Sequence, residues 1–253
     1  MTNALKEKWA SGGTALGAWL MLREPLVAES ASLAGFDYVN LDMQHGLLSF
    51  EDVVTMLYAT ARTPTTPVVR VPWNEPGIIG RVLDAGAYGV IIPMVNTAAE
   101  ARAAVSACRY APRGARSMGP MGVSARAARE GYYGSANDNV ACIPMIETKQ
   151  AVENIDEILA VPGIDAIYIG PADLSLTYGL DPRVDQEDAT WNAALKTVVD
   201  ACARHGVVPG IHASAELAAK RHATGFRMIT VGFDTSVFTT IRSELKTARD
   251  GTS

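Results

Sequence analysis

The stretch Pro67–Val95, PVVRVPWNEPGIIGRVLDAGAYGVIIPMV, contains the pattern that decides the fold. Two short apolar runs, Pro67–Val71 and Gly89–Val95, are rich in β-branched residues, which predicts strands. Gly77–Ala85 lies between them with apolar residues three and four positions apart, which predicts a helix. Strands of near-continuous hydrophobicity are typical of parallel sheets covered on both faces. The stretch therefore predicts a strand–helix–strand unit.

The same alternation recurs along the whole chain. The other predicted strands are Ala15–Leu22, Tyr38–Gln44, Val140–Glu147, Ala166–Gly170, Val208–Ala213 and Met228–Gly232. The other predicted helices are Pro25–Ala34, Glu51–Ala61, Thr97–Cys108, Gln150–Leu159, Trp191–His205 and Ala215–Thr224, several with a plausible N-cap at Ser49, Asn96 or Thr97, and Ser214.

About eight right-handed units of this kind predict one α/β domain over residues 1–253, a (β/α)₈ TIM barrel. A doubly wound sheet is the structural alternative. Such a sheet is expected to carry a glycine-rich phosphate turn, and the chain has neither GxGxxG nor GxxxxGK[ST]. The barrel is therefore the preferred prediction.

Two segments fall outside the alternation. Residues 110–139, rich in Gly, Arg and Ala, form a long insertion after the fourth unit. Long loops are usually functional or mobile, so we expect it at the mouth of the site, with a surface or subunit-contact role as the alternative. Thr235–Arg249 predicts an amphipathic helix that packs on its own barrel or on a neighbour's, with an apolar face made of Val237, Phe238, Ile241 and Leu245.

Composition and charge exclude several classes of partner. The chain is 48% hydrophobic with a net charge of −5, and the absence of a basic cluster argues against nucleic acid. Cys108, Cys142 and Cys202 are odd in number and widely spaced, which predicts neither a disulfide framework nor a zinc–thiolate site. No apolar run approaches the roughly 18 residues of a spanning helix, and the N-terminus lacks a signal-peptide pattern. We expect a cytoplasmic protein with no membrane partner.

Polar residues follow several apolar runs where the carboxyl ends of parallel strands meet, the end at which barrel enzymes collect reactive groups. They are Asp42, Gln44, His45, Arg70, Glu147 and Asp173. Glu147 and Asp173 follow adjacent strands, about 4.8 Å apart, so they predict a shared Mg²⁺ or Mn²⁺ site. Its open positions would let a 2-oxo acid chelate, which polarises the carbonyl and stabilises an enolate. The alternative is that each carboxylate caps the element that follows it.

Arg70 is expected to point to the barrel mouth and to stabilise a carboxylate or a developing enolate oxygen. Its alternative role is an ion pair with Asp42 or Glu147. No lysine ends a predicted strand, which argues against a Schiff-base aldolase because that mechanism needs a desolvated lysine at the reacting carbon.

Histidines supply the remaining candidates. His45 follows the second strand and is predicted to be a general base, with a surface loop histidine as the alternative. Asp84 is a candidate to orient His45 if its helix end comes close to the second strand. His212 ends the seventh strand and is a candidate to touch substrate.

The strand-end motifs occur in the order DMQHG, VVRVPWNEP, LDAGAYGVIIPMV, RYAPRGARSMG, PMIET and IGPADLS. Their order and spacing resemble those of the class II pyruvate aldolases, the 4-hydroxy-2-oxoheptanedioate and 2-dehydro-3-deoxyglucarate aldolase family, also called hydroxy ketoacid aldolases. The resemblance covers essentially the whole chain. It implies a barrel of the phosphoenolpyruvate/pyruvate-binding type that reversibly cleaves 4-hydroxy-2-oxo acids. The products would be an aldehyde and pyruvate, or a pyruvate-like donor such as hydroxypyruvate, formed through a metal-stabilised enolate.

The resemblance also implies roles for individual residues. Glu147 and Asp173 would hold one divalent ion, Mg²⁺, Mn²⁺ or Co²⁺, with no organic cofactor. His45, made more basic by Asp84, would direct proton transfer, and Arg70 would stabilise the enolate. The predicted substrate-binding residues are Gln44, Arg70, Gly170, Pro171, Ala172, Asp173 and His212. A homo-oligomer is implied as well, commonly a hexamer, with the final helix exchanged between neighbours.

The chain departs from the family pattern at three places. Gln44 stands where members often carry Glu, before a more apolar loop, Met145 stands where many have Gln, and His212 stands where an aliphatic residue is usual. These changes argue against a carboxylate-bearing aldehyde, such as succinic semialdehyde, as the preferred acceptor. Two alternatives remain, a metal–enolate lyase for phosphoenolpyruvate or an acyl-CoA ester and a non-catalytic barrel. The loops IHASAE and VGFDTS lack a glycine-rich phosphate cradle, which disfavours the first.

Overall fold

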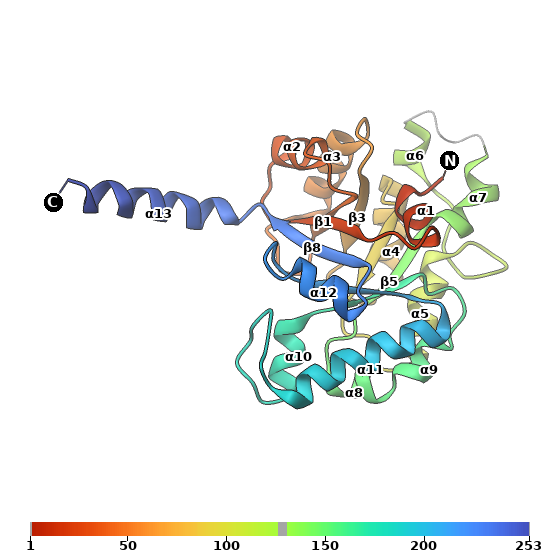
Figure 1. The fold of residues 1–253 in the computed structure, drawn as a ribbon. Helices are drawn as coiled ribbons and strands as arrows, with labels where there is room; N and C mark the ends of the chain where they lie inside the picture. Colours follow the sequence, from red (N-terminus) through yellow and green to blue (C-terminus); the bar gives the residue numbers. More distant parts are fainter. Residues whose placement is uncertain (1, 126–130, 253) are drawn as a thin grey trace.

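The computed structural model describes residues 2–125 and 131–252. Within them lie eight parallel strands, β1 (Ala15–Leu20), β2 (Tyr38–Asp42), β3 (Thr66–Arg70), β4 (Gly89–Ile92), β5 (Ala141–Pro144), β6 (Ala166–Ile169), β7 (Val208–His212) and β8 (Met228–Phe233). They pair in the order β5-β4-β3-β2-β1-β8-β7-β6. A parallel bridge between Met145 and Tyr168 joins β5 to β6, so the sheet closes into a barrel, as predicted (Figure 1).

Helices that follow the strands cover the outside of the barrel. They are α2 (Pro25–Leu33), α3 (Phe50–Thr60), α4 (Pro76–Ala85), α5 (Ala98–Cys108), α8 (Lys149–Glu153), α9 (Ile155–Leu159), α10 (Pro171–Thr177), α11 (Ala189–His205) and α12 (Ala218–Thr224). Ser49 and Thr97 are N-caps, as expected, and each also forms a capping box with the acidic residue three positions later. Ser214 does not cap α12, because that helix begins later, after Leu217. The helix predicted over 150–159 is divided in two at Asn154.

The core has an outer and an inner part because strand side chains alternate between the two faces of the sheet. Val39 and Leu41 point outward into the apolar layer beneath the helices. Trp19, Tyr38 and Tyr168 belong to the cluster that fills the barrel interior. The interior is therefore packed, and a substrate can reach reactive groups only at an end of the barrel.

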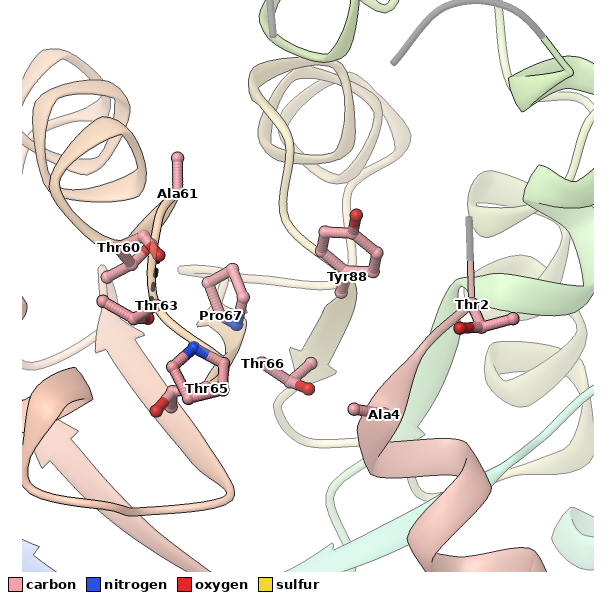
Figure 2. Close-up of a pocket in the computed structure, with 10 residues that line it drawn as sticks. Thr2, Ala4, Thr60, Ala61, Thr63, Thr65, Thr66, Pro67 and Tyr88 are labelled. Atoms are coloured by element: carbon pink, nitrogen blue, oxygen red, sulfur yellow. Dashed lines mark hydrogen bonds between the residues drawn. The ribbon is translucent and has the colours of Figure 1, made fainter. Parts of the chain in front are cut away.

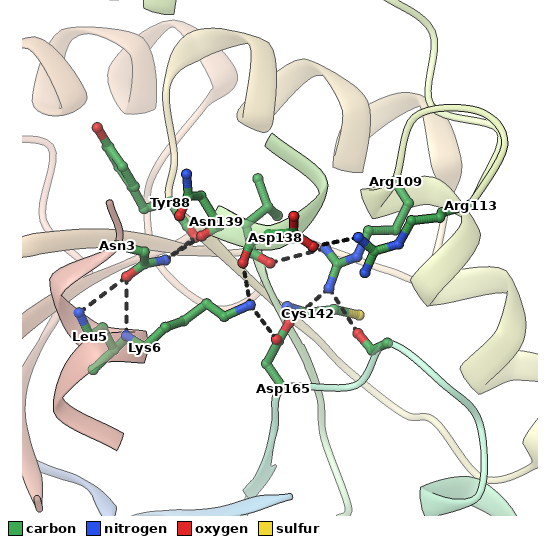
Figure 3. Close-up of polar contacts among 12 residues, drawn as sticks. Asn3, Leu5, Lys6, Tyr88, Arg109, Arg113, Asp138, Asn139, Cys142 and Asp165 are labelled. Carbon is green, nitrogen blue, oxygen red and sulfur yellow. Dashed lines mark hydrogen bonds and ion pairs between the residues drawn. The ribbon is translucent and has the colours of Figure 1, made fainter. Parts of the chain in front are cut away.

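Helix α1 (Ala4–Ala10) closes the amino end of the barrel. Its Leu5 and Trp9 join the interior cluster. Asn3 caps the helix by accepting the Leu5 N–H and donates to two backbone carbonyls, while Lys6 pairs with Asp165 at 2.6 Å (Figure 3). These polar contacts hold the helix in place, so the carboxyl end is the open one.

The insertion at residues 110–139 lies at the amino end of the strands, so its expected position at the mouth of the site is wrong for its described part. It contains α6 (Met121–Ala125) and α7 (Tyr132–Asn139), and residues 126–130 lie outside the described residues. The reason is topological, since it connects the end of α5 to the start of β5 and each barrel helix runs back towards the amino ends. Arg116 in this segment pairs with Asp84 in the last turn of α4. The surface or subunit-contact alternative remains.

Helix α13 (Ser236–Asp250) extends away from the barrel (Figure 1). None of its residues is buried, so the helix is amphipathic, as predicted, but does not pack on its own barrel. Where β8 meets β1, an apolar groove of about 520 Å³ stays open between α2 and the start of α13, lined by residues that include Leu20, Val27, Phe36 and Phe233. Across residues 2–125 and 131–252, no helix has the length and apolar character needed to cross a membrane.

Candidate active site

A cavity of about 260 Å³ opens at the carboxyl ends of the strands. The predicted site residues that line it are His45, Arg70, Gly170, Pro171, Ala172, Asp173 and His212. Trp19, Met21, Tyr168 and Val184 also line it and are not predicted from the sequence, and so does Met145, which the sequence analysis names only as a departure from the family pattern. Because reactive groups of barrel enzymes gather at this end, this cavity is the candidate active site.

A second cavity, of about 280 Å³, lies at the amino end of β3 (Figure 2). Threonines dominate its lining, and the hydroxyls of Thr60, Thr63 and Thr65 already donate to backbone carbonyls. No charged side chain is among the described residues that line it. We therefore assign no chemistry to this cavity.

Arg70 and Asp42 form a two-pronged ion pair at the base of the candidate site. The two residues face each other on β2 and β3, and Arg70 donates from Nε to Oδ1 at 2.8 Å and from Nη2 to Oδ2 at 2.5 Å. Trp19 Nε1 adds a third hydrogen bond to Asp42 at 3.0 Å. Burial alone would raise the pKa of Asp42, but these partners hold it below its ordinary value. The alternative predicted for Arg70 is thus found, and its guanidinium is held at the cavity with its charge largely compensated.

Glu147 is buried at the end of β5, with only 2% of its surface exposed. Its Oε1 accepts the Met94 N–H at 2.8 Å, and a Cβ on Gly170 would lie 2.6 Å from Oε2, so glycine is needed there. Burial raises the pKa of Glu147 to about 7, and the nearby Asp173 charge adds to the rise, while the Met94 N–H and Arg70 oppose it. Glu147 is therefore buried and within electrostatic range of the Asp173 carboxylate, which is partly exposed at the cavity.

This donor set fits a hard divalent cation. Mg²⁺ and Mn²⁺ favour carboxylate oxygens, and Mg²⁺ commonly uses one or two protein carboxylates with water and substrate oxygens. A cation between Glu147 and Asp173 would relieve the repulsion between them. No group of three or more His, Cys, Asp or Glu able to hold a metal occurs in the described residues, so the site differs from a three-ligand zinc site. No side chain caps α10 either, which leaves the first-turn N–H groups near Ala172 available to an anion.

Met94 is a positioning residue for Glu147. It has a left-handed backbone, with φ of 55°, a conformation that costs a non-glycine residue about 1–3 kcal/mol. We expect Met94→Pro to lower the free energy of unfolding by more than about 1 kcal/mol and to weaken metal binding, because proline lacks the N–H and cannot adopt this φ. Met94→Gly keeps the backbone N–H and can adopt the left-handed φ, so it serves as the control. Calorimetric titration with Mn²⁺ and urea unfolding check this, and equal metal affinity in the two variants would contradict it.

His45 lines the cavity, but Asp84 does not reach it within one chain. The His45 backbone N–H donates to Asp42 at 3.3 Å, which places its ring at the mouth. Asp84 lies in the last turn of α4, at the opposite end of the barrel, and pairs with Arg116 at 2.8 Å. Helix α4 runs back towards the amino ends of the strands, so its last turn does not come close to the carboxyl end of the second strand, as the predicted contact requires. A role for Asp84 at His45 would require a second copy of the chain.

Gln44 is not among the cavity-lining residues, although it was predicted to bind substrate. Its backbone N–H donates to Asp42 at 2.9 Å, so it helps to fix the loop after β2. Its side-chain oxygen is buried and has no hydrogen-bond partner in the described part of the chain. The prediction that it binds substrate therefore gains no support from this geometry.

His212 is neutral in the folded protein at ordinary pH. Burial lowers its pKa to about 4, and the positive charge of Arg70 adds to the effect. An unfolded histidine has a pKa near 6.5. Between about pH 6.5 and 4 the unfolded chain therefore binds a proton at His212 that the folded chain does not bind. We expect the free energy of unfolding of the wild type to fall by up to about 3 kcal/mol relative to that of His212→Phe as pH falls through this window.

Urea unfolding of both proteins at pH 7 and pH 4.5 measures this difference. His222→Phe, at an exposed position of α12, is the matched control and should follow the wild type. A gap between wild type and His212→Phe that stays constant with pH would contradict the expectation.

Comparisons with known proteins identify the chain's relatives. The family model of HpcH/HpaI aldolase/citrate lyase matches residues 15–240. A hydroxypyruvate/pyruvate aldolase of Rhizorhabdus wittichii is 42% identical over 92% of each chain. A 4-hydroxy-2-oxo-heptane-1,7-dioate aldolase of Salmonella heidelberg is 39% identical over 94% of this chain and 90% of the relative.

Solved structures agree with the sequence relatives. A crystal structure of an HpcH/HpaI aldolase/citrate lyase family protein from Burkholderia cenocepacia superposes with a TM-score of 0.90 at 33% identity, covering 98% of this chain and 100% of that one. The resemblance predicted from the strand-end motifs is thereby confirmed. The chain belongs to the HpcH/HpaI aldolase/citrate lyase family.

Proposed function

We propose that the protein is a divalent-metal-dependent aldolase that reversibly cleaves 4-hydroxy-2-oxo acids to an aldehyde and pyruvate or hydroxypyruvate. One observation carries the proposal. Asp173 and Arg70 line one cavity at the carboxyl ends of the strands, and the charges of both act on Glu147, which is buried behind the lining residue Gly170. The names of the relatives at 42% and 39% identity support it. We place this activity in the cytoplasm, and three free, buried cysteines agree with a reducing compartment.

The chemistry divides among a few groups. A divalent cation held by Glu147 and Asp173 would be Mg²⁺, Mn²⁺ or Co²⁺ and would supply Lewis-acid polarisation of the 2-oxo group. The first-turn N–H groups of α10 bind the carboxylate of the 2-oxo acid. Arg70, fixed by Asp42, stabilises the negative charge that develops on the enolate oxygen.

His45, at the mouth of the cavity, serves as the general base. In the cleavage direction His45 accepts the proton of the C4 hydroxyl, the C3–C4 bond breaks, and the electron pair of that bond moves into the enolate. The aldehyde leaves, and protonation of C3 gives the 2-oxo acid product. In synthesis the same steps run in reverse.

The test is pyruvate release from a 4-hydroxy-2-oxo acid by chelator-treated protein, before and after adding Mg²⁺, Mn²⁺ or Co²⁺. We expect release only after a metal is added. Full release without metal would remove the metal from the mechanism. No release with any metal or chain length would overturn the aldolase, and the same protein would then be assayed with phosphoenolpyruvate and acyl-CoA esters.

We further infer a homo-oligomer, a hexamer by resemblance, in which α13 lies in the groove of a neighbouring barrel. The α13 residues Val237, Phe238, Ile241 and Leu245 are between 43% and 57% exposed, a large apolar stripe for an unpartnered helix. The groove at the base of α13 is apolar and lies where the eighth barrel helix would pack. The two surfaces therefore complement each other between copies of the chain.

We expect Phe238→Asp/Ile241→Asp to lower the molar mass measured by light scattering, because two charges would be buried in an apolar groove. Thr239→Asp/Ser243→Asp adds the same charges on the opposite face of α13 and should leave the assembly intact. An unchanged mass for the first variant would show that α13 does not hold the oligomer together.

A further inference from the structure

A chain of hydroxyl groups runs through the barrel interior to the ring of His212. Tyr38 Oη lies 2.8 Å from Thr230 Oγ1, and Thr230 Oγ1 lies 2.5 Å from Tyr168 Oη. Tyr168 Oη lies 3.3 Å from His212 Nδ1. Tyr38, Thr230 and Tyr168 are fully buried, so water cannot substitute for a missing partner.

Counting protons assigns the histidine tautomer. Three hydrogen bonds link four groups, and each of the three hydroxyls has one proton to donate. Burial raises the pKa of both tyrosines, so these protons stay in place. If His212 Nδ1 is unprotonated, Tyr38 donates to Thr230, Thr230 to Tyr168, and Tyr168 to Nδ1, and every proton is used. If Nδ1 carries a proton, four protons compete for three links and one buried donor is left unpaired, which is costly.

The remaining ring nitrogen of His212, Nε2, therefore carries the proton. The imidazole ring of His212 packs edge-on to the Trp19 ring, with 5.0 Å between the ring centroids, and its centroid lies 4.8 Å from that of the Phe233 ring. These contacts fix the plane of the His212 ring at the cavity. Nε2 has no hydrogen-bond partner among the described residues, and His212 lines the cavity. An oriented, uncharged N–H donor is thus available to a bound molecule.

We propose that His212 donates a hydrogen bond from Nε2 to a neutral hydroxyl oxygen of the substrate, and that the enzyme thereby favours hydroxyl-bearing substrates over their deoxy counterparts. A carboxylate is a poorer partner, because the donor is uncharged and Arg70, the only Lys or Arg among the described cavity-lining residues, is already paired with Asp42. This inference rests on the proposed aldolase function, but its first test does not.

The first test is a long-range ¹H–¹⁵N spectrum of the histidine rings, which distinguishes a protonated from an unprotonated ring nitrogen. The chain has 4 histidines, so the signals lost in His212→Phe identify the residue. We expect protonation at Nε2 in the wild type. Tyr38→Phe should retain it, since Thr230 and Tyr168 still fill both remaining links. Tyr168→Phe removes the donor to Nδ1 and should yield a mixture of tautomers. A proton on Nδ1 in the wild type would overturn the inference.

The second test compares matched substrates that differ by one hydroxyl. Hydroxypyruvate is compared with pyruvate as donor, and glycolaldehyde with acetaldehyde as acceptor. The preference is the ratio of kcat/KM for the hydroxylated substrate to kcat/KM for its deoxy counterpart. In at least one pair, His212→Phe should lower this ratio about threefold to tenfold from the wild-type value. Tyr38→Phe should keep the wild-type ratio in both pairs. Unchanged preferences in His212→Phe would overturn the substrate role while the aldolase stands. A wild type inactive with every pair would overturn the aldolase and this role together, and would leave the tautomer assignment untouched.

Discussion

Glu147→Gln is expected to lower metal-dependent pyruvate release by at least about 1,000-fold. The substitution removes one of two predicted metal ligands, and a Lewis-acid metal contributes several kcal/mol to the stabilisation of such a transition state. Folding should be preserved, because Gln has nearly the same shape and can still accept the Met94 N–H. Burial raises the pKa of Glu147 to about 7, so loss of its charge leaves the free energy of unfolding unchanged or higher.

The matched control for this variant is Glu153→Gln. Glu153 lies on α8, where its side chain is 63% exposed and pairs with Lys149 at 3.9 Å. It should retain wild-type kcat/KM and metal affinity. Steady-state pyruvate assays and titration of metal-free protein with Mn²⁺ measure both properties. If Glu147→Gln kept a tenth or more of wild-type activity, or bound Mn²⁺ as well, Glu147 would not be a metal ligand.

Asp42→Asn is expected to lower the free energy of unfolding by about 3–5 kcal/mol. The change leaves the buried Arg70 guanidinium without its counter-charge, and breaking one side of a buried ion pair carries a cost of this size. Activity should fall as well, because Asn has one acceptor oxygen in place of two, so Arg70 loses one of the two hydrogen bonds that fix its orientation. Urea unfolding followed by circular dichroism measures the stability change.

Two further variants separate charge from shape at this position. Asp181→Asn removes an exposed carboxylate that lies 3.5 Å from Arg183, and it should change stability by less than about 1 kcal/mol. Asp42→Asn/Arg70→Met removes both buried charges, so it should recover much of the lost stability without recovering activity. A double variant as unstable as Asp42→Asn would mean that shape rather than charge dominates at this position.

The strand-end residues illustrate what a sequence can predict about a site. Arg70, Glu147 and Asp173 are predicted as site residues because each follows an apolar strand, and all carboxyl ends of a parallel barrel meet at one end. Trp19 and Tyr168 were missed, although both are inward-facing residues with polar tips on apolar strands. An aromatic residue with a polar tip on an apolar strand is the available signal in the sequence. The same pattern occurs for aromatic residues of a packed core and for those that line a cavity, so it does not distinguish them.

Other features depend on distances in space that no local pattern encodes. The resemblance implies that Asp84 acts on His45, whereas α4 places Asp84 at the opposite end of the barrel, where it pairs with Arg116. The insertion at 110–139 was expected at the mouth, whereas it joins elements at the amino ends. In both cases the direction of a helix across the barrel decided the location. The sequence left open whether Arg70 pairs with Asp42, and the side-by-side register of β2 and β3 brings the two together.

The sequence by itself determined the barrel, its strand ends and the two carboxylates that we propose as metal ligands, because hydrophobic periodicity and the polar residues that end each strand are local properties. Only the tertiary structure decided which charges are compensated, how the interior hydroxyls orient His212, and that α13 leaves its own barrel. These outcomes depend on burial and on contacts between residues far apart in the chain, such as Tyr38 with Thr230. Their energies exist only once the barrel has closed.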